Sequence, residues 1–169
     1  MSTPPTAVVT MADPRWRPSR RAPLLWALGA ALGWAAVFVA QMVWGFVDRA
    51  WTTWPHVAVF AATALAAVAH VFVVPRWRYR VHRWEISDTA VYTRTGWFTQ
   101  ERRIAPISRI QTVDTERGPL ERMLGLATVT VTTASSAGAV RIEALDSGVA
   151  DAAVTRLTEI AGRNVGDAT

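Results

Sequence analysis

The side chains that could support chemistry are three histidines, thirteen carboxylates and eighteen arginines, in a chain of 169 residues without cysteine or lysine. The histidines are His56, His70 and His82, and none has a carboxylate or a second histidine at metal-ligand spacing. The absence of cysteine excludes thiol catalysis, disulfides and cysteine-ligated zinc. The sequence therefore predicts no metal site.

Sequence motifs of catalysis are also missing. The chain contains no glycine-rich nucleotide loop, no GxSxG nucleophile turn and no HExxH pair. Eleven acidic residues follow position 84, but they are mixed with arginines at positions typical of turns and surfaces. Carboxylates far apart in the sequence could still meet in the folded chain. We expect a protein that is not an enzyme and that uses no cofactor.

Two apolar segments dominate the first half of the chain. Residues 24–47 contain no charged side chain, and residues 57–74 contain one titratable group, His70. At about 1.5 Å per residue such helices are about 36 and 27 Å long, against about 30 Å for the hydrocarbon core of a bilayer. Nothing else in the chain could bury both segments on all sides. A transmembrane hairpin over residues 24–75 is therefore favoured over buried helices of a soluble protein.

Three further observations concern these segments. His70 has no acidic partner in either segment, which favours a hydrogen bond between the helices, or an interfacial position, over a proton relay. Gly29 and Gly33 form a GxxxG pattern, which is found where membrane helices pack closely. A cleaved signal peptide is the alternative for the first segment, although its apolar run exceeds the about 7–15 residues usual for one.

The arginines indicate how the hairpin is oriented. Four arginines and one aspartate precede the first segment, four arginines follow the second, and the connecting turn has one charge of each sign. The positive-inside rule then places both ends in the cytoplasm. We expect a multi-pass protein of the inner (cytoplasmic) cell membrane with cytoplasmic N- and C-termini.

Tryptophans bracket the two segments as in the interfacial belts of membrane proteins. Flanking arginines can contact anionic lipid at about 1 kcal/mol each. The predicted membrane-interface residues are Arg20, Arg21, Arg76, Arg78, Arg80, Arg83, Trp44, Trp51, Trp54 and Trp77. The lipid bilayer is the partner expected for this set.

From residue 78 onward the pattern changes to short β-like runs separated by turn residues. Strands are predicted over 78–86, 90–95, 97–105, 110–116, 127–133 and 140–144, a helical turn over 120–124, and a helix over 147–161 that ends at Gly162. The helix has an apolar stripe of Val149, Ala153, Leu157 and Ile160. In residues 127–133 apolar side chains alternate with threonines, which predicts one buried and one solvated face.

This order of elements predicts an α+β chain. A two-helix transmembrane hairpin is followed by a bent antiparallel sheet or small barrel, which the C-terminal helix caps. The predicted parts are a disordered cytoplasmic tail (1–23), the hairpin (24–75), a cytoplasmic domain (76–163) and a second disordered tail (164–169).

Several stretches of the sequence resemble one known family. They are Trp84-Glu-Ile-Ser-Asp, Thr95-Gly-Trp-Phe, Arg103-Ile-Ala-Pro-Ile, Ile110-Gln-Thr-Val-Asp and Arg117-Gly-Pro-Leu-Glu-Arg-Met-Leu-Gly-Leu-Ala-Thr-Val-Thr-Val. These are similar to the bacterial pleckstrin-homology-like (PH) domains of the YdbS-like membrane proteins. The resemblance covers residues 26–162 and implies two spans followed by one cytoplasmic PH-like domain. It also implies assembly with a second membrane protein that has PH-like domains, or self-association.

The family motif consists of Gln111, Gly118, Pro119, Leu120 and Gly125. We expect these residues to act mainly as scaffold. The two glycines are expected to provide positive φ angles or close approach beside a short turn. The proline is expected to start that turn, and Leu120 is expected to pack it on the sheet together with the leucine four residues later. Gln111 could hold the turn or offer a contact on a binding edge.

The function expected from these observations is an interaction or scaffold module anchored in the membrane, acting in envelope assembly or stress resistance. An anionic-lipid headgroup sensor is the alternative, but the loop that is basic in phosphoinositide-binding PH domains reads Ser87-Asp88-Thr89 here. Nucleic acid is not an expected partner despite a pI of about 11.1. The basic excess flanks the apolar segments, whereas residues 84–169 hold nine arginines against eleven acids.

Overall fold

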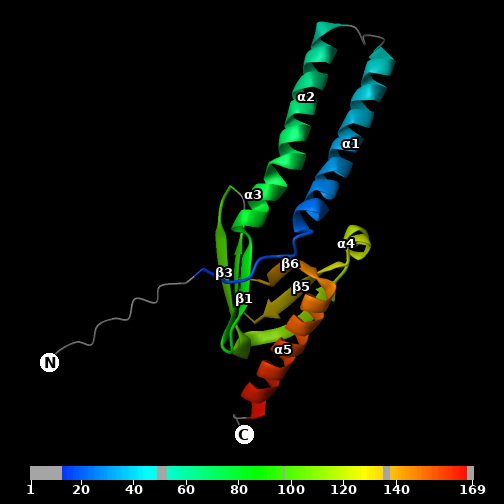
Figure 1. Ribbon diagram of the computed structural model, residues 1–169. Coiled ribbons are helices and arrows are strands. Elements are labelled where there is room, and N and C mark those ends of the chain that lie inside the picture. Colours follow the sequence, from blue (N-terminus) through cyan, green and yellow to red (C-terminus); the bar gives the residue numbers. More distant parts are fainter. Residues whose placement is uncertain (1–12, 49–52, 97, 135–137, 167–169) are drawn as a thin grey trace, which may run out of the picture.

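The computed structural model describes residues 13–48, 53–96, 98–134 and 138–166. Two long helices, α1 (Ala22–Asp48) and α2 (Trp54–Phe72), lie side by side and project from one end of a folded domain (Figure 1). A short helix, α3 (Val74–Val81), leads from α2 into that domain. Both apolar segments are long enough to cross a membrane, and only 6% of each apolar window is buried. This exposure is typical of candidate membrane spans and not of core helices.

A hydrogen bond joins the two long helices within their apolar length. Trp34 Nε1 on α1 donates to His70 Nδ1 on α2 at 3.1 Å, which confirms the predicted hydrogen bond between the helices. The GxxxG pattern of Gly29 and Gly33 does not bring α1 close to α2. A Cβ atom at either glycine would meet nothing within 4 Å, so the prediction of close packing between α1 and α2 at these glycines is wrong.

The domain contains two three-stranded antiparallel sheets. The first has the order β1-β2-β3, formed by β1 (Arg83–Ile86), β2 (Ala90–Thr95) and β3 (Glu101–Pro106). The second has the order β4-β5-β6, formed by β4 (Ile110–Glu116), β5 (Leu126–Thr133) and β6 (Val140–Asp146). A 3-10 turn (Ile107–Arg109) links the sheets, and a short helix, α4 (Pro119–Leu124), links β4 to β5.

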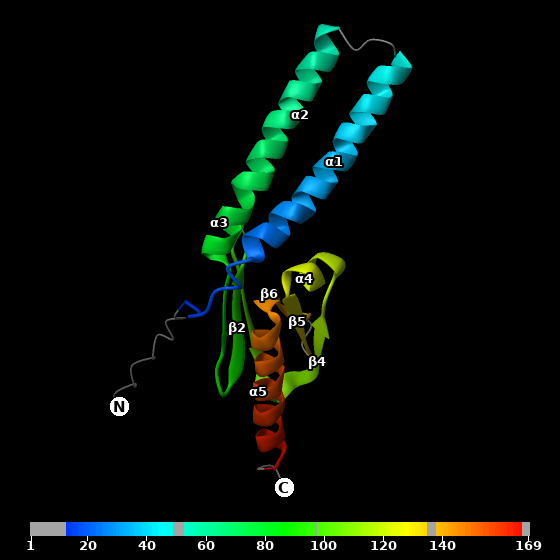
Figure 2. The same cartoon turned by 45° about the vertical axis from the view of Figure 1, so that its right-hand side comes forward.

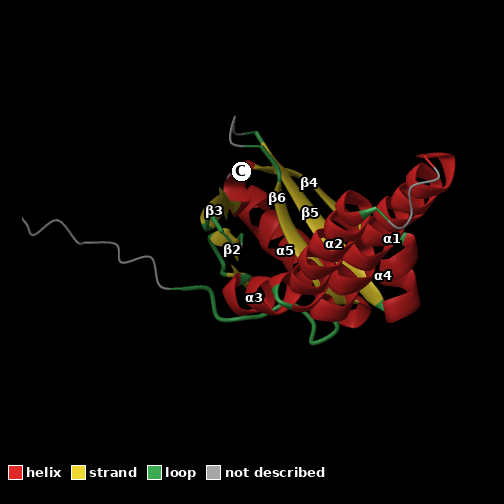
Figure 3. Cartoon of the chain, turned by 90° about the horizontal axis from the view of Figure 1, so that it is seen from above, coloured by secondary structure: helices red, strands yellow, loops and turns green. Residues whose placement is uncertain are grey.

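Helix α5 (Ser147–Gly166) closes the domain. Figure 3 shows the strands of the first sheet on one side of α5 and those of the second sheet on the other. Val91 of β2, Val129 of β5, Ile142 of β6 and Leu157 of α5 meet in one buried cluster. The predicted α+β architecture, a helical hairpin followed by a bent antiparallel sheet capped by the C-terminal helix, is confirmed.

The first predicted strand is wrong at its start. Residues 78–81 belong to α3, and the strand begins at Arg83. Charged and apolar residues alternate between Arg76 and Val81 with the period of a strand, but Pro75 occupies the first turn of a helix. Proline fixes the backbone for a helix start and lacks only an N–H that would be unpaired there. This local preference outweighs the alternation.

Helix α5 also differs from the prediction. It continues through Gly162, because one interior glycine costs about 1 kcal/mol, less than burial of Ile160 can offset. The buried stripe begins at Ala150, which is fully buried, whereas Val149 is 42% exposed.

Residues 13–21, here called the N-terminal segment, form part of the folded domain. Trp16 makes an antiparallel bridge with Trp84 of β1, with N–H···O distances of 3.0 and 2.8 Å. The Ser19 N–H donates to the Ala144 carbonyl of β6 at 2.9 Å, and Ser19 Oγ donates to Asp146 Oδ1 at 2.7 Å. The predicted disordered tail up to residue 23 is therefore wrong for these residues, whose partners lie far away in the sequence.

Candidate functional site

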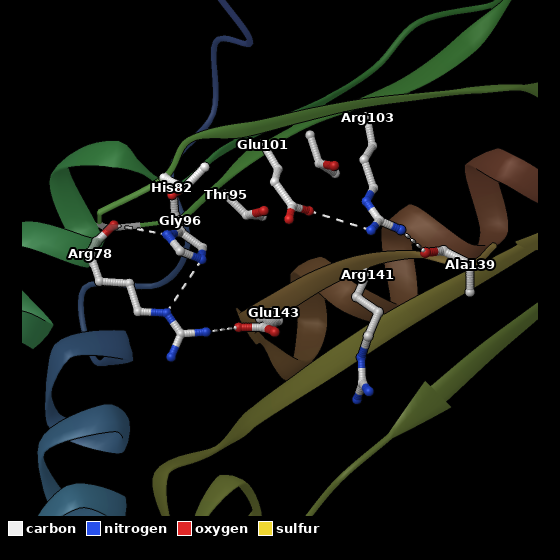
Figure 4. Close-up of a pocket in the computed structure, with 11 residues that line it drawn as sticks. Arg78, His82, Thr95, Gly96, Glu101, Arg103, Ala139, Arg141 and Glu143 are labelled. Carbon is white, nitrogen blue, oxygen red and sulfur yellow. Dashed lines mark hydrogen bonds and ion pairs between the residues drawn. The ribbon is translucent and has the colours of Figure 1, made fainter. Parts of the chain in front are cut away.

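The two sheets separate between β3 and β6, which do not pair with each other. A hollow of about 490 Å³ lies between them (Figure 4). A second hollow, of about 450 Å³, lies beside Arg103 and is lined by Arg102, Arg109 and Val140. We call the two hollows together the intersheet cleft. The charged and titratable side chains of the first hollow are Arg78, His82, Glu101, Arg103, Arg141 and Glu143.

Arg78 joins three elements at the end of the cleft nearest the long helices. Its guanidinium, from α3, donates to Glu143 Oε2 of β6 at 2.6 Å. The same group lies 4.4 Å from the ring centroid of Trp26 on α1, a cation–π distance. Its side chain is 31% exposed. Arg78 thus points into the cleft (Figure 4), away from the lipid-facing position that we expected for it.

His82 follows α3 as its C-terminal cap and is buried. Its Nδ1–H donates to the Arg78 carbonyl at 2.9 Å, and its Nε2 accepts from Arg78 Nε at 3.4 Å. Burial, and then the positive charge of Arg78, lower the pKa of His82 below its ordinary value of 6.5. The imidazole is therefore neutral near pH 7, and its two nitrogens have distinct partners.

The remaining charges of the cleft are largely paired. Arg103 lies 3.4 Å from Glu101 Oε2, and its Nη1 donates across the cleft to the Ala139 carbonyl at 3.3 Å. Arg141 lies 2.8 Å from Glu116. Within the described ranges, no three metal-ligating side chains come together. Such a surface offers polar recognition of main chain and charged side chains, with no activated nucleophile among the groups described.

The other predicted interface arginines occupy three kinds of position. Arg20, just before α1, and Arg76 and Arg80, on α3, are exposed. Arg21 donates to the Leu124 carbonyl of α4 at 2.9 Å, which fastens α4 beside α1. Arg83 is half-buried on the first sheet and donates to the Arg15 carbonyl at 3.4 Å.

The predicted interface tryptophans lie at both ends of the hairpin. Trp77 is 53% exposed on α3, next to the domain. Trp44 and Trp54 are 47% and 80% exposed at the far end of α1 and α2. Trp51 lies outside the described residues.

The family motif surrounds α4. Pro119 is the first residue of this helix, as predicted, and Gly125 follows it with a φ of +68°. Gly118 has neither predicted feature, because its φ is −65° and a Cβ atom there would meet Glu121 Oε2 at an ordinary 3.5 Å. Gly118 instead donates its N–H to Glu121 Oε2 at 2.7 Å, and Glu121 Oε1 accepts from Thr128 Oγ1 at 2.7 Å. Glu121 was missed in the sequence, although an acidic residue three positions after a helix cap is a recognisable signal.

The other motif residues have unequal roles. Leu124 packs with Ala22 and Leu126 at the N-terminal end of α1, so α4 contacts the helical hairpin as well as the sheet. Leu120 is half-buried on the same helix. Gln111 is exposed at an irregularity in the β4–β5 pairing and makes no side-chain hydrogen bond to a described residue. It therefore does not hold the turn.

The comparison with known families agrees with this layout. A sequence model of the bacterial PH domain matches residues 23–161, which include both long helices and most of the domain. The chain belongs to the bacterial PH domain family. Over 86 residues it is 35% identical to the transmembrane protein YdbS of Bacillus subtilis, a stretch covering 51% of this chain and 54% of YdbS.

The chain thus spans about half the length of this curated relative. No solved structure matches it. A relative described as a transmembrane protein, together with two apolar and nearly unburied helices, makes this bacterial PH domain protein a membrane protein.

Proposed function

We propose that this bacterial PH domain protein is a membrane-anchored interaction module whose intersheet cleft binds a segment of a partner protein. The hairpin crosses the inner membrane twice, with both termini in the cytoplasm. The observation that carries the proposal is the pair of unpaired strand edges, β3 and β6, that border the cleft.

Unpaired edges favour an extended partner segment. β3 pairs only with β2, and β6 pairs only with β5, so each has main-chain groups without a strand partner in the described sheets. On β6 the N-terminal segment occupies one of these groups, the Ala144 carbonyl. Such edges are templates for strand addition. The Arg103 bond to the Ala139 carbonyl spans the gap at present, and an incoming strand would displace it.

The side chains of the cleft set the character of the partner. Arg103 and Arg141 are about half exposed, and Glu101 offers a carboxylate at the same opening. We infer a partner segment with both charge signs. A second membrane protein with PH-like domains, or another copy of this chain, satisfies this condition because its own strand edges can pair in the cleft. A role in envelope assembly or stress resistance belongs to the same proposal.

A photo-crosslinking amino acid at Ile104 tests the partner, because this residue lies on β3, lines the second hollow and is 40% exposed. In native membranes the full chain should crosslink to one defined protein or to itself. The matched control is a crosslinker at Glu159, which is exposed on α5. Equal and diffuse crosslinking at both positions would contradict the proposal, and Arg103→Glu should weaken a genuine crosslink.

The orientation of the hairpin is tested separately. The chain has no cysteine, so single-cysteine variants report one position each. The variant Thr53→Cys places the thiol at the far end of the hairpin, and Asp88→Cys places it in the domain. A membrane-impermeant thiol reagent applied to spheroplasts should label the first variant and not the second. The reverse pattern would overturn the proposed topology.

A further inference from the structure

The two most exposed large apolar side chains among the described residues of the domain are Phe98 and Met123. They are 88% and 80% exposed. Phe98 lies in the turn between β2 and β3, and Met123 lies on α4. Figures 1 and 2 place both elements at the end of the domain from which the long helices leave, whereas the C-terminal end of α5 lies at the opposite end.

Strand register fixes the position of the β2–β3 turn. Arg83, the first residue of β1, pairs with Arg94, and Arg94 pairs with Arg102. The residues between Arg94 and Arg102 therefore extend beyond the start of β1, on the side from which α3 arrives. Arg94 Nε also donates to the Val81 carbonyl at 3.0 Å, which ties this end of the sheet to α3.

Gly96 sets the backbone at the start of the turn. Gly96 has a φ of +105°, and a Cβ atom there would lie 1.9 Å from the Thr99 carbonyl oxygen. Only glycine fits such a turn. Phe98 lies two positions after this glycine.

Helix α4 is held at the same end by different contacts. Arg21, directly before α1, donates to the Leu124 carbonyl, and Leu124 packs against Ala22 at the first turn of α1. The β2–β3 turn therefore lies beside α3, and α4 lies beside α1. The two exposed apolar side chains flank the hairpin on its two sides.

Exposed arginines lie on the elements of this end. Arg122 is next to Met123 on α4, Arg76 and Arg80 lie on α3, and Arg20 lies just before α1, while one exposed carboxylate, Glu101, lies at the base of the β2–β3 turn. Apolar side chains with neighbouring arginines are the composition of surfaces that lie in the headgroup region of an anionic membrane. A bilayer crossed by the long helices continues directly over this end of the domain, so the surface meets lipid without any further partner.

We propose that the β2–β3 turn and α4 form a membrane-docking rim. Phe98 and Met123 enter the boundary between headgroups and acyl chains of the leaflet nearest the domain, and the exposed arginines contact lipid phosphates. This second attachment fixes the rotation of the domain about the hairpin. It requires only that the helices span the membrane, and it holds whether or not the intersheet cleft binds a protein.

Single-cysteine variants of the full chain in nanodiscs test the rim. Phe98→Cys and Met123→Cys are labelled with a fluorophore, and Asp88→Cys, in the β1–β2 turn, is the matched control. Lipids that carry a nitroxide near the headgroup should remove most of the fluorescence at positions 98 and 123 and little at position 88. Equal quenching at all three positions would overturn the proposal.

Two further measurements test whether lipid protects the β2–β3 turn and whether a second copy of the chain covers Met123. Amide hydrogen exchange of the unlabelled protein should slow around Phe98 in nanodiscs relative to detergent, and equal exchange in both would contradict the rim. A second copy could cover Met123 instead of lipid. Efficient disulfide formation between Met123→Cys chains, without lipid quenching, would identify that occupant and overturn the lipid proposal.

Discussion

Arg78 behaves differently from the arginines on either side of it because of helical geometry. Arg76 and Arg80 are four residues apart on α3 and share a face, whereas residues two apart point to different sides of a helix. The first two are exposed, and Arg78 turns inward to Glu143 and Trp26. One side chain thereby joins α1, α3 and β6.

Glu143→Gln should destabilise the domain, because it removes the charge that pairs with a partly buried guanidinium. Because the Gln amide oxygen can still accept, we expect a loss of at most about 1.5–3 kcal/mol in the free energy of unfolding, the usual value of a hydrogen bond to a charged group. Denaturant unfolding in detergent, followed by near-ultraviolet circular dichroism, measures it. Glu159→Gln, at an exposed site on α5, is the control and should have no effect. Equal values for the two variants would contradict the role of the Arg78–Glu143 pair.

His82 makes stability depend on pH. Its pKa is lowered in the folded state by burial and by Arg78, so the unfolded chain binds a proton more readily. Stability should therefore decrease as the pH falls below about 6.5 and continue to fall until the folded-state pKa is reached. Proton uptake would also remove the acceptor at Nε2 that faces Arg78, although Glu143 nearby favours the charged form.

Thermal unfolding between pH 7.5 and 5 checks this dependence. His82→Gln keeps a polar side chain but does not titrate, so its unfolding temperature should vary less with pH than that of the unchanged protein. His56 and His70 are present in both proteins, and their contribution cancels in the comparison. Parallel pH curves for the two proteins would contradict the assignment.

At the scale of elements, the N-terminal segment completes the domain. It adds a bridge to the outer edge of β1 and then bonds to β6, so one segment joins both sheets before α1 begins. Ser19 has little exposed surface and uses both its N–H and its hydroxyl group. The domain of this family member thus includes residues on both sides of the hairpin.

Ser19→Ala should lower the free energy of unfolding by about 1–3 kcal/mol, because Asp146 loses a hydroxyl donor at a partly buried site. Ser108→Ala is the matched control, since Ser108 is exposed and makes no side-chain hydrogen bond to a described residue. Urea unfolding of both variants gives the comparison. A Ser19 variant as stable as its control would show that the segment contributes little.

The two motif glycines should respond differently to alanine. Gly125→Ala forces a Cβ into the left-handed region, at a cost of about 1–2 kcal/mol. Gly118 has a negative φ, and its Cβ would meet Glu121 Oε2 at 3.5 Å, an ordinary contact. Gly118→Ala should therefore cost less than about 1 kcal/mol, the usual penalty of alanine at a helix cap. Equilibrium unfolding of both variants measures the two costs. A larger cost for Gly118→Ala than for Gly125→Ala would contradict this prediction.

At the scale of the whole molecule, the position of the β1–β2 turn bears on the headgroup-sensor alternative. The β1–β2 turn with Asp88 lies at the other end (Figure 1), where Asp88 is 3.6 Å from Arg156 of α5. A headgroup sensor built on this turn, as in phosphoinositide-binding PH domains, would face away from the bilayer that the helices enter.

Lipid that copurifies with the protein should reflect this arrangement. Replacing both Arg76 and Arg80 with Gln should lower the bound anionic lipid, because each arginine near the surface is worth about 1 kcal/mol. Asp88→Arg should leave it unchanged despite the added charge. Mass spectrometry of lipids from nanodisc-reconstituted protein compares the variants. A gain of anionic lipid on Asp88→Arg would favour the sensor alternative.

Local patterns predicted the elements well and their contacts poorly. The apolar segments and the strands over 90–95 and 110–116 are confirmed, because hydropathy and alternation act over a few residues. The intersheet cleft was not predicted, since it depends on how far β3 and β6 diverge. Arg103 meets the Ala139 carbonyl across 36 positions of sequence, and no periodicity encodes that distance. Arg78 was expected at the membrane because it is one of the flanking arginines, and their positions in the sequence do not show that its side chain faces Glu143 and Trp26.

The bonds of Ser19 have a consequence for biogenesis. Its partner Asp146 lies 127 positions later, so this contact forms only after residue 146 and both long helices have left the ribosome. Both ends of a hairpin that crosses twice lie in the same compartment. A chain in which one helix fails to insert would hold residues 13–21 on the wrong side, with the β1 edge uncovered. Completion of the domain would then depend on correct insertion of both helices.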